Sequence, residues 1–171
     1  MNFNILNKFT THLRQVLRNA TESAARTGKT YIQPEDMLAA LVKQRGSIGA
    51  EILLKSRLRP EHLPTPLPSS ERSMKDVKAD TPRLSEQSKR AIEKAALVAS
   101  EHEHKYIGTE HLLFGLLAIH HPDIERIFTH HGIRVEELEQ HLKIVLKSTS
   151  KFPDLTKFFR EGGANPQEFL D

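Results

Sequence analysis

An internal repeat is the feature of this sequence that most restricts its fold. The segment YIQPEDMLAAL, which starts at Tyr31, returns as YIGTEHLLFGL at Tyr106, an offset of 106 − 31 = 75 residues. The same offset aligns residues 9 to 63 with the second copy without a gap; examples are Phe9 with Leu84, Thr10 with Ser85, Ala20 with Ala95, Glu35 with Glu110, Leu41 with Leu116, Leu58 with Ile133 and Leu63 with Leu138. One register held over this length indicates a tandem duplication.

Both copies have the apolar spacing of amphipathic helices, and neither has the alternation typical of strands. Thr10 and Ser85 are suitable N-caps, Gly28 is typical of a helix end, and Pro34 suits a first turn. The expected helices follow Thr10, begin at Pro34, span 47–56 and start near Pro60 in the first copy, and follow Ser85 and span 109–119, 122–130 and 134–147 in the second. The sequence therefore predicts an all-α fold of two tandem four-helix repeats, packed as a pseudo-twofold bundle.

The composition of the remaining segments predicts how the chain is organised. We expect one domain over residues 1–147, with repeat 1 at about 9–63 and repeat 2 at about 84–147. Residues 64–83 are rich in Pro, Ser and charge, and are expected to form an exposed connector. Residues 148–171 are expected to form a flexible linker.

The tripeptide Gly28-Lys29-Thr30 raises the question of a phosphate-binding loop. Such a loop requires the pattern G-x-x-x-x-G-K-[ST] after a buried strand. Ser23 stands where the first Gly is needed, and the preceding segment is helical in pattern. The second copy has Glu103-His104-Lys105 at the same place. We interpret the tripeptide as a loop between helices.

Composition and charge exclude several classes of protein. There is no Cys, which excludes disulfides and thiolate chemistry and suits a reducing compartment. No signal peptide is apparent, and the longest apolar run, 112–119, is too short to span a bilayer. The expected location is therefore cytoplasmic, without membrane contact. A net charge of +3 with mixed signs does not indicate a nucleic-acid partner, although the pI near 9.2 keeps a helical nucleic-acid binder as a rival hypothesis.

No residue pattern indicates catalysis or a metal site. The ten His residues include no pair at helical i, i+4 spacing with a carboxylate between them, and structural zinc sites usually use Cys. No G-x-S-x-G nucleophile elbow is present. We expect no metal, no cofactor and no enzymatic activity.

One constellation occurs in both copies. Each copy combines a helix-capping hydroxyl, Thr10 or Ser85, with a carboxylate in the first turn of the following helix, Glu35 or Glu110. Capping and dipole complementation account for these residues without a ligand. Alternatively, if two helix starts lie together, backbone N–H groups would bind an anion and the carboxylate a cation, which suits a phosphorylated guanidinium. The residues alone leave both interpretations open.

The segments FTTHLRQVLRNATESAARTGKTYIQPEDMLAALV and LSEQSKRAIEKAALVASEHEHKYIGTEHLLFGLL resemble the two repeats of the Clp N-terminal domain, the substrate- and adaptor-binding module of Clp-type AAA+ unfoldases. The resemblance covers about residues 9 to 147. The GTEHLLFGLL form is most similar to the ClpC branch, whereas QPEDMLAAL is closer to the ClpB style.

The resemblance implies a non-catalytic domain that binds protein substrates and adaptors for an ATPase ring and its protease. In ClpC-type domains it also implies phosphoarginine binding, here at Glu110 with Ser85 and at Glu35 with Thr10. The second copy keeps the GTEH context and is expected to be the better site, since Pro34 removes a backbone donor and Asp36 adds negative charge in the first.

The end of the chain resembles the junction at which ClpC-type proteins enter their first ATPase module. The segment FPDLTKFFREGGANPQEFLD shares the DLT and EG elements of that junction and then departs from it. The chain is therefore interpreted as the N-terminal domain of a longer unfoldase. The alternative is a stand-alone regulatory adaptor of a Clp protease.

Overall fold

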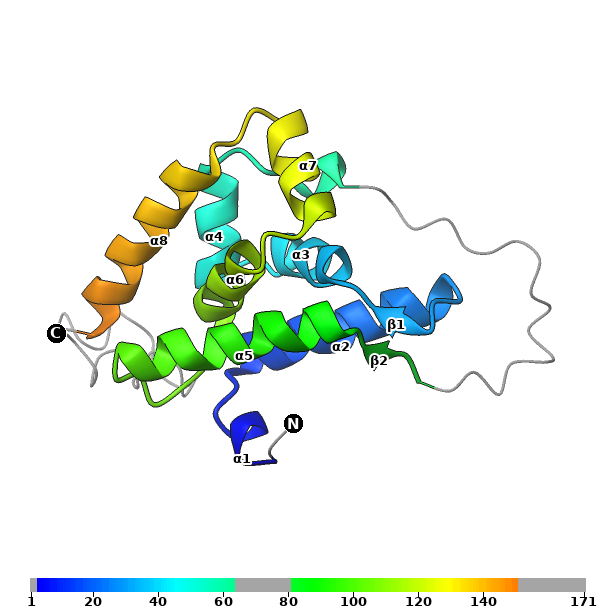
Figure 1. Cartoon of the computed structure of the whole chain (residues 1–171), viewed down its shortest axis with the longest axis horizontal. Coiled ribbons are helices and arrows are strands. Elements are labelled where there is room, and N and C mark those ends of the chain that lie inside the picture. Colours follow the sequence, from blue (N-terminus) through cyan, green and yellow to red (C-terminus); the bar gives the residue numbers. More distant parts are fainter. Residues whose placement is uncertain (1–2, 64–80, 151–171) are drawn as a thin grey trace, which may run out of the picture.

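The computed structural model describes residues 3–63 and 81–150 (Figure 1). Helices dominate this part of the chain, as the sequence predicts. In chain order the elements are α1 (Phe3–Leu6), α2 (Thr11–Arg26), β1 (Tyr31–Ile32), α3 (Pro34–Lys43), α4 (Ile48–Lys55), the 3₁₀ helix η1 (Pro60–His62), β2 (Arg83–Leu84), α5 (Glu86–Glu101), α6 (Thr109–Ala118), α7 (Pro122–His130) and α8 (Val135–Ser150).

The predicted helices of both repeats are confirmed to within a few residues. The fourth element of the first repeat is a 3₁₀ helix of three residues, where a helix was expected near Pro60. Helix α8 continues to Ser150, past the expected end at Lys147. The two-residue strands were not expected, because two residues are too few to produce an alternating pattern. Residues 64–80 and 151–171, which hold most of the expected connector and linker, lie outside the described residues.

The two repeats pair with each other reciprocally, which gives the bundle its pseudo-twofold symmetry. Ile32 of β1 pairs in parallel with Leu84 of β2. Adding 75 to Ile32 gives Ile107, and subtracting 75 from Leu84 gives Phe9; Phe9 and Ile107 form a parallel bridge of their own. In each repeat, therefore, the segment that holds Ile32 or Ile107 pairs with the segment of the other repeat that holds Leu84 or Phe9.

The offset also extends to unusual backbone conformations. Gly28 has φ +70°, and Glu103, 75 residues later, has φ +56°. In the same way Arg57 has φ +69° and Gly132 has φ +68°. Left-handed backbone costs a non-glycine residue roughly 1–2 kcal/mol. Because each pair keeps it where only one member is Gly, the packing of the repeat sets these turns.

Helices α3 and α6 are equivalent by the offset and contact each other in the middle of the bundle. Helix α2 packs on α3 and α6, and α5 packs on α6 and α3 (Figure 1). The core lies between them and consists mainly of aliphatic side chains, together with Phe9 and Phe128; its least exposed large members include Leu13, Met37, Leu38, Leu41, Leu53, Leu112, Leu113, Leu116, Ile124 and Leu138.

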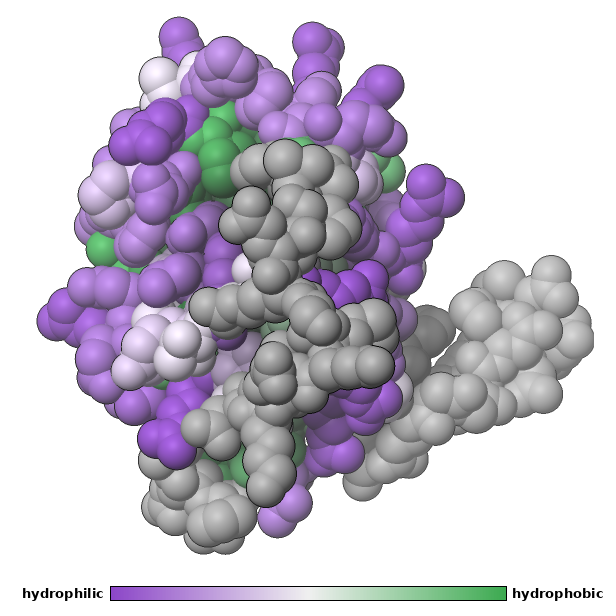
Figure 2. Space-filling model, turned by 90° about the vertical axis from the view of Figure 1, so that its right-hand side faces the viewer, coloured by the Kyte–Doolittle hydropathy of each residue, from purple (hydrophilic) through white to green (hydrophobic). Residues whose placement is uncertain are grey.

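Helices α5 and α6 cross in backbone contact at Gly115. A Cβ atom at this position would lie 2.0 Å from the carbonyl oxygen of Ala91, so no larger residue fits without moving a helix. On the face shown in Figure 2, polar side chains dominate the surface and hydrophobic ones appear in small areas. Among the described helices, none has the length and apolar content needed to cross a bilayer.

Candidate functional site: the crossed helix starts

The two capping hydroxyls behave as the sequence predicts. Thr10 Oγ1 accepts a hydrogen bond from the Leu13 amide at 3.2 Å, and Ser85 Oγ accepts one from the Ser88 amide at 3.1 Å. These bonds begin α2 and α5 and satisfy the third amide of each helix. Capping alone therefore explains the residue type at both positions.

The backbone at the start of α2 and at the start of α5 forms a hydrogen bond with the other repeat in each case. The Thr10 amide donates to the carbonyl of Ile107 at 3.0 Å, and the Ser85 amide donates to the carbonyl of Ile32 at 3.1 Å. The start of α2 thus lies beside the segment that leads to Glu110, and the start of α5 lies beside the segment that leads to Glu35. The sequence suggested that Thr10 combines with Glu35 and Ser85 with Glu110, each within one copy. In the structure Thr10 lies beside the segment of Glu110, and Ser85 lies beside the segment of Glu35.

The start of α2 and the start of α5 each have backbone amides that donate no hydrogen bond within the helix. The first amides of a helix have no intrahelical acceptor. Within residues 3–63 and 81–150, the cap side chain accepts from one of these amides in each helix, that of Leu13 or of Ser88. This leaves Thr11 and His12 at the start of α2, and Glu86 and Gln87 at the start of α5. The α2 start has no acidic residue in its first turn, whereas α5 carries Glu86 there. The α2 start is therefore the better environment for an anion.

Glu110, expected to be the better ligand-binding carboxylate, is sealed inside the bundle. Its relative exposure is 2%, and its neighbours Thr109 and His111 are buried too. The carboxylate folds back over Gly108: a Cβ atom there would lie 2.5 Å from Glu110 Oε2. The Glu110 carboxylate is therefore not open to an external ligand in this structure.

Glu35 occupies the equivalent position in the first repeat but remains accessible, with 26% of its side chain exposed. Its Oε2 lies 3.9 Å from Nδ1 of His121, the N-cap residue of α7. The residue before α3 is Gln33, whose equivalent is Gly108. Since Gln33 carries the Cβ that Gly108 lacks, the space that holds the Glu110 carboxylate is closed in the first repeat. This explains why the two glutamates differ in exposure.

The third residue of each acidic helix closes the N-cap in the same way with different chemistry. Asp36 Oδ2 accepts from the Gln33 amide at 2.8 Å, and His111 Nδ1 accepts from the Gly108 amide at 2.8 Å. Asp36 and His111 are equivalent by the offset. Because an amide donates to His111 Nδ1, that nitrogen carries no proton and the neutral imidazole is protonated at Nε2.

The partners of these two residues are equivalent as well. Lys29 Nζ binds Asp36 Oδ1 at 2.6 Å, and His104, 75 residues after Lys29, lies with Nδ1 2.7 Å from His111 Nε2. An ion pair in the first repeat is thus replaced by an imidazole pair in the second. The lysine of Gly28-Lys29-Thr30 holds a helix start, in agreement with its interpretation as an inter-helix loop.

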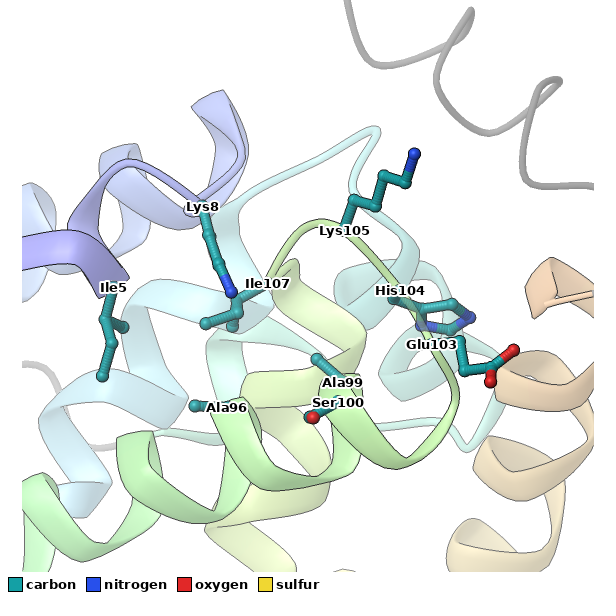
Figure 3. A pocket seen from close by; sticks show the side chains of 9 residues that line it. All are labelled: Ile5, Lys8, Ala96, Ala99, Ser100, Glu103, His104, Lys105 and Ile107. Atoms are coloured by element: carbon teal, nitrogen blue, oxygen red, sulfur yellow. The ribbon is translucent and has the colours of Figure 1, made fainter.

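A pocket of about 320 Å³ opens beside the Thr10–Ile107 contact, between α1, the C-terminal half of α5 and the loop before α6. Ile5, Ala96, Ala99 and Ile107 form its apolar lining (Figure 3). In this view the Lys8 side chain runs toward Ile107, whereas Lys105 points away from the cavity. The sequence analysis did not identify this pocket, because the residues of α1 carry no pattern that links them to α5.

Comparisons with known proteins agree with the repeat structure. A model of the Clp repeat (R) N-terminal domain matches twice, at residues 8–85 and 83–157. The chain is 29% identical to the chaperone protein ClpB of Mycobacterium leprae over 155 residues, which covers 86% of the chain and 18% of that protein. It is also 29% identical over 144 residues to the negative regulator of genetic competence ClpC/MecB of Bacillus subtilis, covering 82% of the chain and 17% of that protein.

The predicted similarity to ClpC-type proteins is confirmed, and a ClpB protein matches at the same identity. The chain spans about a fifth of the length of these relatives. Among solved structures, the complex of the ClpV N-domain with a VipB peptide has the same fold, with a TM-score of 0.61 at 18% identity over 84% of this chain and 89% of that one. The twofold match of the family model covers most of the sequence, and the chain belongs to the Clp repeat (R) N-terminal domain family.

Proposed function

We propose that this chain is a non-catalytic domain that binds protein substrates and adaptors for a Clp-type ATPase, whose ring and associated protease then process the bound protein. The observation that carries this proposal is the double match to the Clp repeat over nearly the whole chain. The ClpV N-domain, which shares the fold, was solved with a peptide bound. Peptide binding on the same two-repeat framework is the activity that this chain most directly supports.

The pocket beside α1 offers a place for an apolar side chain of such a peptide. Its lining combines Ile5 and Ile107 with two alanines of α5, and small alanine side chains leave the space open. Lys8 at its edge would favour a peptide that carries a carboxylate near the inserted residue. The rim also includes Glu103 and Lys105, so charges of both signs surround the apolar lining. Recognition of an extended segment by an apolar recess with a polar rim is typical of peptide-binding domains.

A finer proposal concerns phosphoarginine. A phosphate needs unused helix-start amides and a guanidinium needs an exposed carboxylate. Glu35 is partly exposed, although its Oε2 is buried, and it lies beyond the segment that touches the α5 start, so of the two glutamates it offers the more accessible carboxylate to a guanidinium. A ligand can reach the Glu110 carboxylate only if this side chain moves away from Gly108. On access to the carboxylate we therefore rank Glu35 above Glu110, the reverse of the order expected from the sequence, although the α5 start beside Glu35 carries Glu86 and is the less favourable of the two helix starts for a phosphate.

Binding of a fluorescein-labelled disordered protein, β-casein, to the 171-residue chain tests the general proposal by fluorescence anisotropy. Saturable binding is expected, and it should weaken when the pocket is filled by Ala96→Trp. The matched control is Leu97→Trp, an exposed neighbour on α5. Absence of binding, or equal binding by both variants, would contradict the proposed role of the pocket.

Calorimetry with free phosphoarginine tests the finer proposal separately. Loss of a charge-assisted bond from a partly exposed carboxylate should weaken binding by about tenfold in Glu35→Gln. Glu93→Gln, an exposed carboxylate on α5, is the control. If casein binds but phosphoarginine gives no heat, the domain recognises unfolded protein and the phosphoarginine proposal is refuted. A larger loss for Glu110→Gln than for Glu35→Gln would refute the ranking.

A further inference from the structure

Three metal-ligating side chains from the two repeats meet at the start of α7. Glu35 lies in the first turn of α3, His121 is the N-cap of α7, and Asp123 lies in its first turn. One donor atom from each lies within 4.8 Å of the donor atoms of the other two. All three residues are partly buried, and α3 and α7 are in contact. The cluster therefore spans the boundary between the repeats.

Two atoms of this cluster are buried without a hydrogen bond. Glu35 Oε2 and His121 Nδ1 have no hydrogen-bond partner within residues 3–63 and 81–150. They lie 3.9 Å apart, which is beyond hydrogen-bonding distance. Burying an unsatisfied polar atom is unfavourable, and here two such atoms adjoin the same small space. A group that accepts electron pairs from both atoms would remove the deficit.

We propose that Glu35, His121 and Asp123 form a binding site for a divalent transition-metal ion, with Zn²⁺ as the ion whose donor preference they fit best. One imidazole nitrogen and two carboxylate oxygens are a donor set that zinc accepts, with a fourth position left for water or an external ligand. Hard cations such as Mg²⁺ and Ca²⁺ favour oxygen alone, so the imidazole selects against them.

The distance between Glu35 and His121 is close to the spacing that two ligands of one zinc ion require, whereas the structure places Asp123 only within 4.8 Å of both. Zinc bonds to nitrogen and oxygen of about 2.0–2.1 Å in a tetrahedron place neighbouring ligand atoms about 3.4 Å apart. The Glu35–His121 distance of 3.9 Å is therefore about 0.5 Å too long. Asp123 also lies 3.1 Å from Arg126, an exposed contact, and its two oxygens allow it to keep this partner while binding the ion.

Metal binding and guanidinium binding would exclude each other, because both use the Glu35 carboxylate. His121 and Asp123 belong to the metal site alone. Variants at these two positions therefore test the metal site without removing a residue proposed to bind phosphoarginine. An ion held by α3 and α7 would also link the two repeats and raise the thermal stability of the domain.

Calorimetric titration of the 171-residue chain with Zn²⁺ is the direct test, with the melting temperature as a second readout. We expect one equivalent of Zn²⁺ to bind and to raise the melting temperature. Since even the loss of a residue that merely orients a ligand costs about tenfold or more in metal affinity, His121→Ala and Asp123→Asn should each weaken binding at least tenfold. Glu35→Gln should do the same, which would place a ligand on the first repeat.

The matched control is His120→Asn. His120 is exposed, has φ +49°, which Asn tolerates, and lies 3.2 Å from Glu125, so it reproduces a histidine–carboxylate pair on the surface next to the proposed site. Retained affinity in this variant together with loss in the other three supports the proposal. No binding by the unmodified chain, or equal affinity in His121→Ala, overturns it and attributes any zinc binding to scattered surface histidines. If His121→Ala does not fold, the half-exposed Asp123 decides the outcome.

Discussion

The substitution Gly115→Ala, at the crossing of α5 and α6, should change the stability of the domain through two effects of opposite sign. Alanine is favoured over glycine inside a helix by roughly 1 kcal/mol, so intrinsic propensity alone predicts stabilisation. The structure predicts the reverse, because the added Cβ would lie 2.0 Å from the Ala91 carbonyl oxygen and 3.2 Å from the Ala95 amide nitrogen. A backbone carbonyl has no rotamer that moves it aside, and the helices must separate by at least about 1.4 Å to bring the 2.0 Å contact to an ordinary 3.4 Å.

The magnitude follows from these two terms. Overpacking of a well-packed contact costs about 1–3 kcal/mol, and contact with rigid backbone corresponds to the upper end. After the gain in propensity, the free energy of unfolding should fall by about 2 kcal/mol, which lowers the melting temperature by roughly 4–8 °C in a domain of this size. Urea denaturation followed by far-UV circular dichroism measures the change.

A second glycine provides an internal comparison for this prediction. At Gly49 an added Cβ would lie 2.7 Å from the Thr109 carbonyl oxygen, a smaller overlap at a contact between the repeats. Gly49→Ala should therefore destabilise the domain less than Gly115→Ala does. An unchanged or raised stability of Gly115→Ala, or the reverse order of the two variants, would refute the conclusion that backbone contact at this crossing limits residue 115 to glycine.

Three further substitutions test other parts of the structure. Ser88→Ala removes the buried hydroxyl that donates to the Ile32 carbonyl at 2.7 Å between the repeats, and should lower the free energy of unfolding by about 1 kcal/mol in urea denaturation, whereas no change would show that the bond is dispensable. Gly108→Ala should expel the flexible Glu110 carboxylate at a smaller cost in stability than Gly115→Ala, and a crystal structure with Glu110 still buried would contradict this. Arg57→Gly should stabilise the domain by up to about 1 kcal/mol by relieving a left-handed backbone, and thermal unfolding that shows a loss would contradict the strain.

The sequence predicted the helices because their signals are local. Thr10 and Ser85 each cap the helix that their position indicates, and the apolar spacing identifies the buried faces. The repeat offset predicted a pseudo-twofold arrangement as well. Which repeat completes which helix start was not visible, because the hydrogen bonds from Thr10 to Ile107 and from Ser85 to Ile32 join segments that a linear pattern keeps apart.

The candidate sites depended on contacts of that same long-range kind. The difference between Glu35 and Glu110 follows from one missing Cβ at Gly108, which a helix pattern does not register. The cluster of Glu35 with His121 and Asp123 joins positions 121 − 35 = 86 residues apart, a separation that does not correspond to the repeat offset. A linear sequence indicates a metal site chiefly by ligand spacing within one helix, and these three residues come from two different helices.

Each repeat forms the same backbone pairing with the other, Ile32 with Leu84 and Phe9 with Ile107. This makes the chain equivalent to a homodimer whose two subunits have been joined into one polypeptide. In a true homodimer every substitution appears twice, so the two symmetry-related positions are bound to stay alike. Fusion removes that restriction. Lys29 and Asp36 form an ion pair in the first repeat, whereas the equivalent His104 and His111 form an imidazole pair in the second. The two repeats thereby also differ at the equivalent glutamates: Glu35 keeps a partly exposed carboxylate, whereas Glu110 is buried inside the bundle.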